Sequence, residues 1–228
     1  MQKLLPTASL LMGAILFATI PAYADTYNFV LTGTGAGNYT YTVNSHNYTV
    51  AAGPYKADLT DTTTNTVSHL LVFCLDENKT SQYNTTYPGT YDAPVGANEA
   101  EAAWLAAYSL TQGAPSSNST VIKNLEGPVS MAIWDLMGTR DTPLPSAAAP
   151  FVTLAQNAYS SGAITPLFLS GAKVFNPAGN SQRFVVANAT NFTLTPPNNQ
   201  VATPEPATMA MIGGGLLLVV LGRRGRRQ

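Results

Sequence analysis

Apolar and polar positions alternate along the first part of the chain. Apolar side chains recur at every second position over residues 27–31 and 39–43, on either side of a glycine-rich turn at 33–37. A period of two places them on one face of a strand, so we expect paired strands here. Further strands are expected at 48–50, 56–60 and 67–75.

The middle of the chain changes to a helical period. Residues 98–110 are alanine-rich and begin at an asparagine suited to capping a helix, with acidic residues in the first turn. A second helix is expected after Gly127, with Pro128 at its first position and Gly138 as its left-handed end. A third is expected over 147–159.

The strand pattern returns near the end of the chain. Apolar residues that indicate strands are Phe168, Val174, Phe184, Val186, Phe192 and Leu194. Strands, then helices, then strands predict an α+β domain over residues 25–195: a β-sandwich or partial barrel with a central helical insertion. Two processing segments flank it, an N-terminal signal peptide and a short C-terminal hydrophobic helix.

The N-terminus has the pattern of an export signal. Lys3 precedes an apolar stretch over 4–20, and Ala22 and Ala24 supply small residues at the two positions that signal peptidase recognises. We therefore expect residues 1–24 to be removed by cleavage before Asp25. The alternative is a retained anchor helix, which the shortness of the apolar run disfavours.

The C-terminus combines a short motif, an apolar run and a basic cluster. Pro204, Glu205 and Pro206 precede the apolar run 209–221, and the chain then ends in the cluster Arg223, Arg224, Arg226 and Arg227. This order resembles the PEP-CTERM sorting signal of Gram-negative bacteria, which an exosortase-type membrane transpeptidase processes. The resemblance implies a sorting signal at 204–228, joined to the domain by a linker at 196–203.

The apolar run of this tail contains thirteen residues, whereas a comfortable membrane helix needs about 20. A short, transient inner-membrane insertion is therefore expected, with the arginine cluster stopping it on the cytoplasmic side. The alternatives are a permanent tail anchor and a GPI-type signal. A GPI signal normally ends in its hydrophobic tail, not in arginines.

Charge is low and slightly acidic. Charged residues make up 10% of the chain, and residues 25–203 contain six basic and eleven acidic side chains, a net charge of −5. Residues 25–203 therefore offer no basic patch for phosphates, and nucleic-acid binding is disfavoured. With one cysteine, Cys74, it forms no internal disulfide.

A set of motifs surrounds this cysteine, over roughly residues 65–140. They are Phe73-Cys74-Leu75-Asp76, Tyr87-Pro88-Gly89-Thr90-Tyr91, Ala103-Trp104-Leu105 and Val129-Ser130-Met131-Ala132-Ile133-Trp134-Asp135. They resemble the Cys–Gln thioester-domain group, in which a cysteine and a glutamine form an internal thioester. Cys74 falls on the cysteine position, but Ser130 stands at the glutamine position and has no acyl carbon. The resemblance therefore implies a thioester-like scaffold without the reactive bond.

Two interpretations of Cys74 remain. It is either a small buried hydrophobe in a strand or a free nucleophile. His69 is the nearest candidate base, but five residues along a strand place the two side chains on opposite faces. His46 could approach only through the tertiary fold.

Other candidate residues favour structural roles. Trp104 and Trp134 lie on apolar helical stripes, which favours core positions over a carbohydrate platform. Asp76, Glu77 and Asp92 lack the spacing of a calcium loop and are expected to be solvated. The sequence predicts no metal site and no cofactor.

These patterns favour a non-enzymatic, exported protein of the cell envelope or extracellular matrix, with a structural or adhesive domain and surface polysaccharide as a candidate partner. One alternative is a secreted enzyme acting on surface polysaccharide or protein through acids such as Asp76 and Asp92. The other is a covalent thioester adhesin, which Ser130 disfavours.

Overall fold

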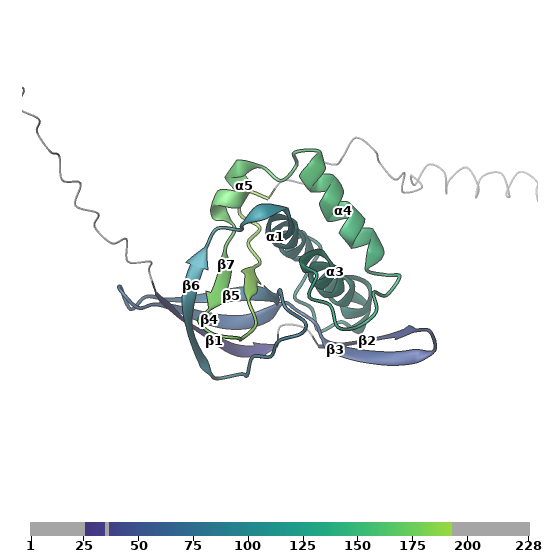
Figure 1. Ribbon diagram of the computed structural model, residues 1–228, viewed down its shortest axis with the longest axis horizontal. Helices are drawn as coiled ribbons and strands as arrows, with labels where there is room; N and C mark the ends of the chain where they lie inside the picture. Colours follow the sequence, from purple (N-terminus) through teal and green to yellow (C-terminus); the bar gives the residue numbers. More distant parts are fainter. Residues whose placement is uncertain (1–25, 35–36, 193–228) are drawn as a thin grey trace, which may run out of the picture.

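Six antiparallel strands close into a barrel, and a block of helices covers one side of it (Figure 1). The computed structural model describes residues 26–34 and 37–192. The barrel strands are β1 (Tyr27–Thr34), β4 (Tyr55–Asp61), β5 (Val67–Cys74), β6 (Thr86–Asp92), β7 (Val174–Pro177) and β8 (Phe184–Val186).

The strand order around the barrel is β1-β4-β5-β8-β7-β6, and β6 pairs with β1 to complete it. Tyr27 of β1 lies opposite Asp61 of β4 on one side and Gly89 of β6 on the other. Because both edges of β1 are paired, the predicted sandwich is wrong and the predicted partial barrel is closed. Closure pairs strand edges that an open sheet would leave exposed, although β8 pairs with only the last three residues of β5.

Aromatic side chains fill the barrel. The ring of Phe29 stacks on Phe175 and Phe184, with centroids 4.6 and 4.8 Å apart, and all three residues are fully or almost fully buried. The period-two pattern of β1 thus places its apolar face in the core, as the sequence predicted. Stacked rings at these distances are favourable beyond their burial alone.

A separate hairpin projects beside the helices (Figure 1), formed by β2 (Asn38–Val43) and β3 (His46–Ala51). Asn44 and Ser45 both have positive φ, as a tight two-residue turn requires. The two strands therefore pair with each other. The expectation of pairing across the glycine-rich turn 33–37 is wrong, because β1 pairs with β4 and β6 instead.

The helical block lies in the chain between β6 and β7. Its segments are α1 (Gly96–Thr111), α2 (Ser119–Val121), η1 (Ile122–Glu126), α3 (Gly127–Met137), α4 (Ala149–Ser160) and α5 (Pro166–Gly171). α1 and α3 pack together, and α4 lies on their outer side (Figure 1). Ala-rich α1 allows close packing, since its alanines at 102, 103, 106 and 107 are all buried.

Local signals predicted most of this block. Pro128 lies in the first turn of α3, and Gly138 ends the helix with φ of 66°, as expected. α3 also continues directly from η1, which contains a wider π-type turn. α1 begins earlier than predicted, at Gly96, so Asn98 does not cap it. A carboxylate oxygen of Glu99 accepts a hydrogen bond from Val95 N instead.

Several C-terminal and intervening segments differ from the expectation. Phe168 lies in helix α5 rather than in a strand, and Phe192 lies outside the strands. β6 was not predicted, because Pro88 and Gly89 interrupt its strand pattern. Leu194, the predicted signal peptide with Ala22, Ala24 and Asp25, the linker and the sorting tail lie outside the described residues.

Candidate functional site

Cys74 ends β5 and is buried. Its Sγ donates to the carbonyl of Asp76 at 3.2 Å, and its own carbonyl accepts a hydrogen bond of 2.9 Å from Trp134 Nε1. Burial raises the pKa of the thiol to about 12. Burial of this kind is what the interpretation as a small hydrophobe expects, and a raised pKa disfavours the thiolate that a nucleophile needs.

Ser130 is buried on α3, one helical turn before Trp134. Its hydroxyl donates to the carbonyl of Glu126 at 2.9 Å and accepts from Gly53 N at 3.0 Å. The hydroxyl thus joins α3 to the segment that leads into β4. The Trp134–Cys74 bond holds the same helix against β5.

Neither histidine is placed to activate Cys74. The side chain of His69 is 83% exposed, and its Nδ1 lies 2.6 Å from Asp58 on the neighbouring strand. The ring of His46 bonds to Asn44 O within the exposed β2–β3 turn. Cys74 lies at the buried end of β5, whereas His69 lies in its exposed half and is paired with Asp58.

Asp76 is buried beside the barrel end, so the expectation of a solvated acid is wrong for this residue. Nη2 of Arg183 lies 2.9 Å from its Oδ1, and Nζ of Lys79 lies 3.8 Å from its Oδ2. Arg183 also reaches Glu99 of α1 with its Nη1, at 3.0 Å. A buried carboxylate needs such partners, and this cluster joins β5, the start of β8 and α1.

The other two acids have different surroundings. The carboxylate of Glu77 accepts hydrogen bonds from Asp141 N at 2.7 Å and Thr142 Oγ1 at 2.6 Å, which fixes the loop after α3. Asp92 is exposed on β6 and accepts from Thr90 and Asn176. Within residues 26–34 and 37–192, no three His, Cys, Asp or Glu side chains converge as a metal site.

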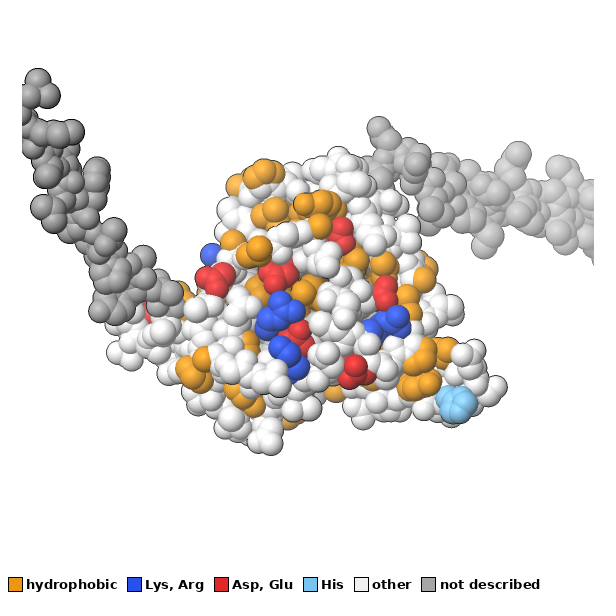
Figure 2. Space-filling model, in the orientation of Figure 1, with side chains coloured by type: hydrophobic (Ala, Val, Ile, Leu, Met, Phe, Trp, Pro, Cys, Tyr) orange, Lys and Arg blue, Asp and Glu red, His pale blue; other side chains and the backbone are white. Residues whose placement is uncertain are grey.

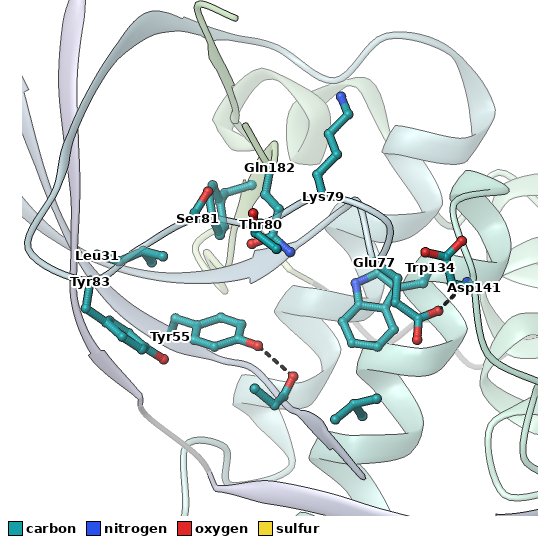
Figure 3. Close-up of a pocket in the computed structure, with 13 residues that line it drawn as sticks. Leu31, Tyr55, Glu77, Lys79, Thr80, Ser81, Tyr83, Trp134, Asp141 and Gln182 are labelled. Atoms are coloured by element: carbon teal, nitrogen blue, oxygen red, sulfur yellow. Dashed lines mark hydrogen bonds between the residues drawn. The ribbon is translucent and has the colours of Figure 1, made fainter. Parts of the chain in front are cut away.

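A pocket of about 410 Å³ opens over this region (Figure 3). Tyr55 and Tyr83 lie at one end, and Glu77, Trp134 and Asp141 lie at the other (Figure 3). The remaining lining residues are Leu31, Val50, Ala51, Lys79, Thr80, Ser81, Gln182 and Phe184. The pocket therefore combines residues from the β5–β6 connection, the barrel, the hairpin and α3.

The β5–β6 connection is held to the barrel at several points. Asn84 N donates to Leu31 O at 2.8 Å, Gln82 N donates to the hydroxyl of Tyr87 at 2.7 Å, and Gln182 Nε2 donates to Asp76 O at 3.0 Å. These bonds fix the backbone that presents Ser81 and Tyr83. The pocket is thus formed in advance by the fold.

The sequence did not indicate this pocket. Tyr83 lies in an Asn/Thr-rich connection, where an aromatic residue among polar ones was the one available signal in the sequence; in the structure its side chain is 44% exposed. Trp104 and Trp134 are 3% and 4% exposed, so the core prediction is confirmed. Trp134 nevertheless lines the pocket.

The surface around these features carries few charges. Figure 2 shows a mixed cluster of acidic and basic side chains near the centre of the visible face and a few smaller charged groups around it, with uncharged side chains over most of the rest. Among the described residues, no helix has both the length and the apolar character needed to cross a membrane. The class that emerges is a low-charge α+β barrel domain with a preformed surface pocket.

Comparison with known proteins adds information on the C-terminal segment. Residues 202–227 match the family model of the PEP-CTERM protein-sorting motif, which confirms the predicted motif. This motif indicates a protein that exosortase, a membrane transpeptidase, sorts to the cell surface. No curated protein and no solved structure gives a significant match to the chain. The resemblance around Cys74 and Ser130 stays a prediction.

Proposed function

We propose that the protein is a non-enzymatic module of the cell envelope or extracellular matrix, with a structural or adhesive role. The observation that carries this proposal is the sorting motif at residues 202–227. The low-charge barrel domain precedes it in the chain. A domain of this kind is suited to a surface where ionic strength varies, because few of its contacts depend on charge.

The proposed route begins with signal peptidase, which removes residues 1–24 after Ala24. The apolar run of the tail then enters the inner membrane briefly, and the arginine cluster stops it at the cytoplasmic side. Exosortase recognises the segment around Glu205, where two flanking prolines favour an extended backbone. Processing there releases the domain to the surface.

Three side-chain environments support a non-enzymatic role. The Cys74 thiol has a pKa of about 12 and is buried, which is unfavourable for a nucleophile. Asp76 is paired with Arg183, so it is a poor general acid or base. Ser130 offers a hydroxyl where a thioester would require an acyl group, and that hydroxyl already makes two hydrogen bonds.

The proposed route is tested by substituting Glu205 in the full chain. The Glu205→Ala variant should accumulate in the membrane fraction with its arginine cluster intact, whereas the matched variant Asn198→Ala in the linker should be released. Mass spectrometry of the released protein should give an N-terminus at Asp25 and no Arg227. Unchanged release of Glu205→Ala, or a mature protein that retains Arg227, would overturn this route.

A further inference from the structure

We propose that the pocket between Tyr83 and Asp141 binds a short segment of a neutral saccharide. This inference rests on the proposed surface role, and it names the chemical class that the domain would hold. The carrying observation is the juxtaposition of exposed aromatic surface with uncharged hydroxyl groups in one preformed pocket (Figure 3).

The aromatic end of the pocket supplies the stacking surface. The Tyr83 side chain is 44% exposed, while Tyr55 behind it is 8% exposed and bonded through its hydroxyl to Ala51 O at 2.6 Å. One face of a pyranose ring presents C–H groups, which are apolar and slightly positive. Such a face packs favourably against the negative face of an aromatic ring.

The polar groups of the pocket match sugar hydroxyls. Ser81 lines the pocket, and its buried Oγ has no hydrogen-bond partner among the described residues, so a rotation of this side chain toward the pocket would let the hydroxyl pair with a ligand. Thr80 adds another hydroxyl, and the exposed Asp141 adds a carboxylate that accepts hydrogen bonds strongly. Each group can pair with a hydroxyl that both donates and accepts.

The charged and polar groups that line the pocket favour a neutral saccharide over an anionic saccharide or a peptide. Lys79, the single basic residue in the lining, lies beside Asp76. Glu77 and Asp141 would repel an anionic saccharide. A cationic peptide would find one carboxylate, since that of Glu77 is occupied by the 141–142 backbone and Thr142. An apolar peptide would leave the hydroxyls of Thr80 and Ser81 unpaired, which is unfavourable.

The volume of the pocket also agrees with a saccharide ligand. The volume of about 410 Å³ lies toward the lower end of the range for small-molecule pockets, which is roughly 300–1,000 Å³. One or two sugar rings fit such a space. Since the pocket is open to solvent, the neighbouring units of a longer chain can extend beyond it.

The test measures binding to the full chain, purified in mild detergent, by isothermal titration calorimetry. The probes are cellotetraose, mannotetraose and N-acetylchitotetraose, with tetragalacturonate as the anionic comparison and tetra-alanine as the peptide. At least one neutral tetrasaccharide should bind, and the two comparison ligands should not. Binding of no neutral tetrasaccharide, or tighter binding of tetra-alanine or tetragalacturonate, would overturn the proposal.

Variants locate the binding. Tyr83→Ala should weaken it by roughly tenfold or more, as expected for an exposed aromatic contact, while Tyr83→Phe should bind as the wild type does. Tyr159→Ala is the matched control, because Tyr159 is also 44% exposed but lies on α4, outside the pocket. Equal binding by Tyr83→Ala and Tyr159→Ala would show that the saccharide binds elsewhere and would overturn the assignment.

This experiment is independent of the sorting route. The backbone near Tyr83 is held by the Asn84–Leu31 and Gln82–Tyr87 bonds, so removal of the ring leaves the connection in place. The folding of each variant is checked by circular dichroism. A protein that binds the saccharide but is not released by exosortase would retain this site and lose the proposed route. A protein that is released by exosortase but does not bind the saccharide would support the proposed route and overturn this site.

Discussion

Arg183 donates hydrogen bonds to both carboxylate oxygens of Asp76: Nη2 of Arg183 lies 2.9 Å from Oδ1 of Asp76, and Nε of Arg183 lies 3.1 Å from Oδ2. The backbone N of Arg183 adds a third bond to Oδ2, at 2.8 Å. These bonds join the end of β5 to the start of β8. Because Arg183 also pairs with Glu99, the same guanidinium connects the barrel to α1.

Removal of the Asp76 charge should therefore destabilise the domain. We expect Asp76→Asn to lower the free energy of unfolding by about 3 kcal/mol, near the lower end for a broken buried pair, because the Arg183 side chain is 26% exposed. Urea unfolding measures this change. Asp141→Asn is the control, since Asp141 is exposed and should change stability by less than about 0.5 kcal/mol. Similar losses in both variants would contradict a special role for the pair.

Gly89 allows β6 and β7 to approach closely. A Cβ at this position would overlap the backbone carbonyl of Asn176 and touch the ring of Phe175. Since a paired backbone cannot move without opening the barrel, Gly89→Ala should cost at least about 2 kcal/mol. Gly33→Ala provides the comparison, because a Cβ there meets nothing within 4 Å. Equal melting temperatures for the two variants would refute the predicted clash.

Glu126 should make stability depend on pH. It is fully buried, its Oε1 accepts from Ser116 N at 2.6 Å, and burial raises its pKa above the ordinary value of 4.5. The folded state therefore binds this proton more tightly than the unfolded chain. Its contribution to stability is largest at low pH and falls as the pH rises from about 4.5 through the raised pKa. Glu126→Gln should flatten this decline, and a residual slope is expected from buried Glu101.

Asp61 provides a control, because its contribution to stability should change with pH in the direction opposite to that of Glu126. Backbone N–H groups of Thr63 and Thr64 lower its pKa from the ordinary value of 3.8. Its contribution is present above that value and is lost as the pH falls through the lowered pKa. Unfolding curves across this range, compared among wild type, Glu126→Gln and Asp61→Asn, distinguish the two directions. A Glu126→Gln profile identical to that of the wild type would contradict the buried-carboxyl argument.

Cys74 should resist alkylation in the folded protein. Iodoacetamide reacts with the thiolate, and a buried thiol with a pKa of about 12 supplies almost none at neutral pH. Labelling should be slow in buffer and fast in urea. The exposed-thiol control is Thr153→Cys on α4 in a Cys74→Ala background, which should label quickly without denaturant. Rapid native labelling of Cys74 would revive the nucleophile interpretation.

The sequence predicted those features that depend on neighbouring residues. Pro128 and Gly138 act within single turns, so the limits of α3 were visible in the chain. The alternation over 27–31 correctly gave the buried face of β1, but alternation alone does not say which strands are partners. The strand β6 stayed hidden because Pro88 and Gly89 are individually unfavourable in strands, and pairing on both edges overrides that preference.

The candidate site was less predictable because its parts come from distant positions. Asp76 and Arg183 are separated by 107 positions, and neither has a local motif that names the other. The pocket depends similarly on the approach of the β5–β6 connection to β1 through the Leu31–Tyr83 bridge. Burial of Trp134 followed from its helical stripe, whereas its contact with the pocket followed from the tertiary fold.

Barrel closure has a consequence for the order of events during export. β7 and β8 complete the ring between β6 and β5, and they are the last strands of the described chain, after the whole helical block. A chain that has crossed the membrane only as far as Lys173 therefore lacks two of the six barrel strands. The barrel can close only after β7 and β8 have also been translocated, and these are the described strands that come last before the sorting motif in the sequence.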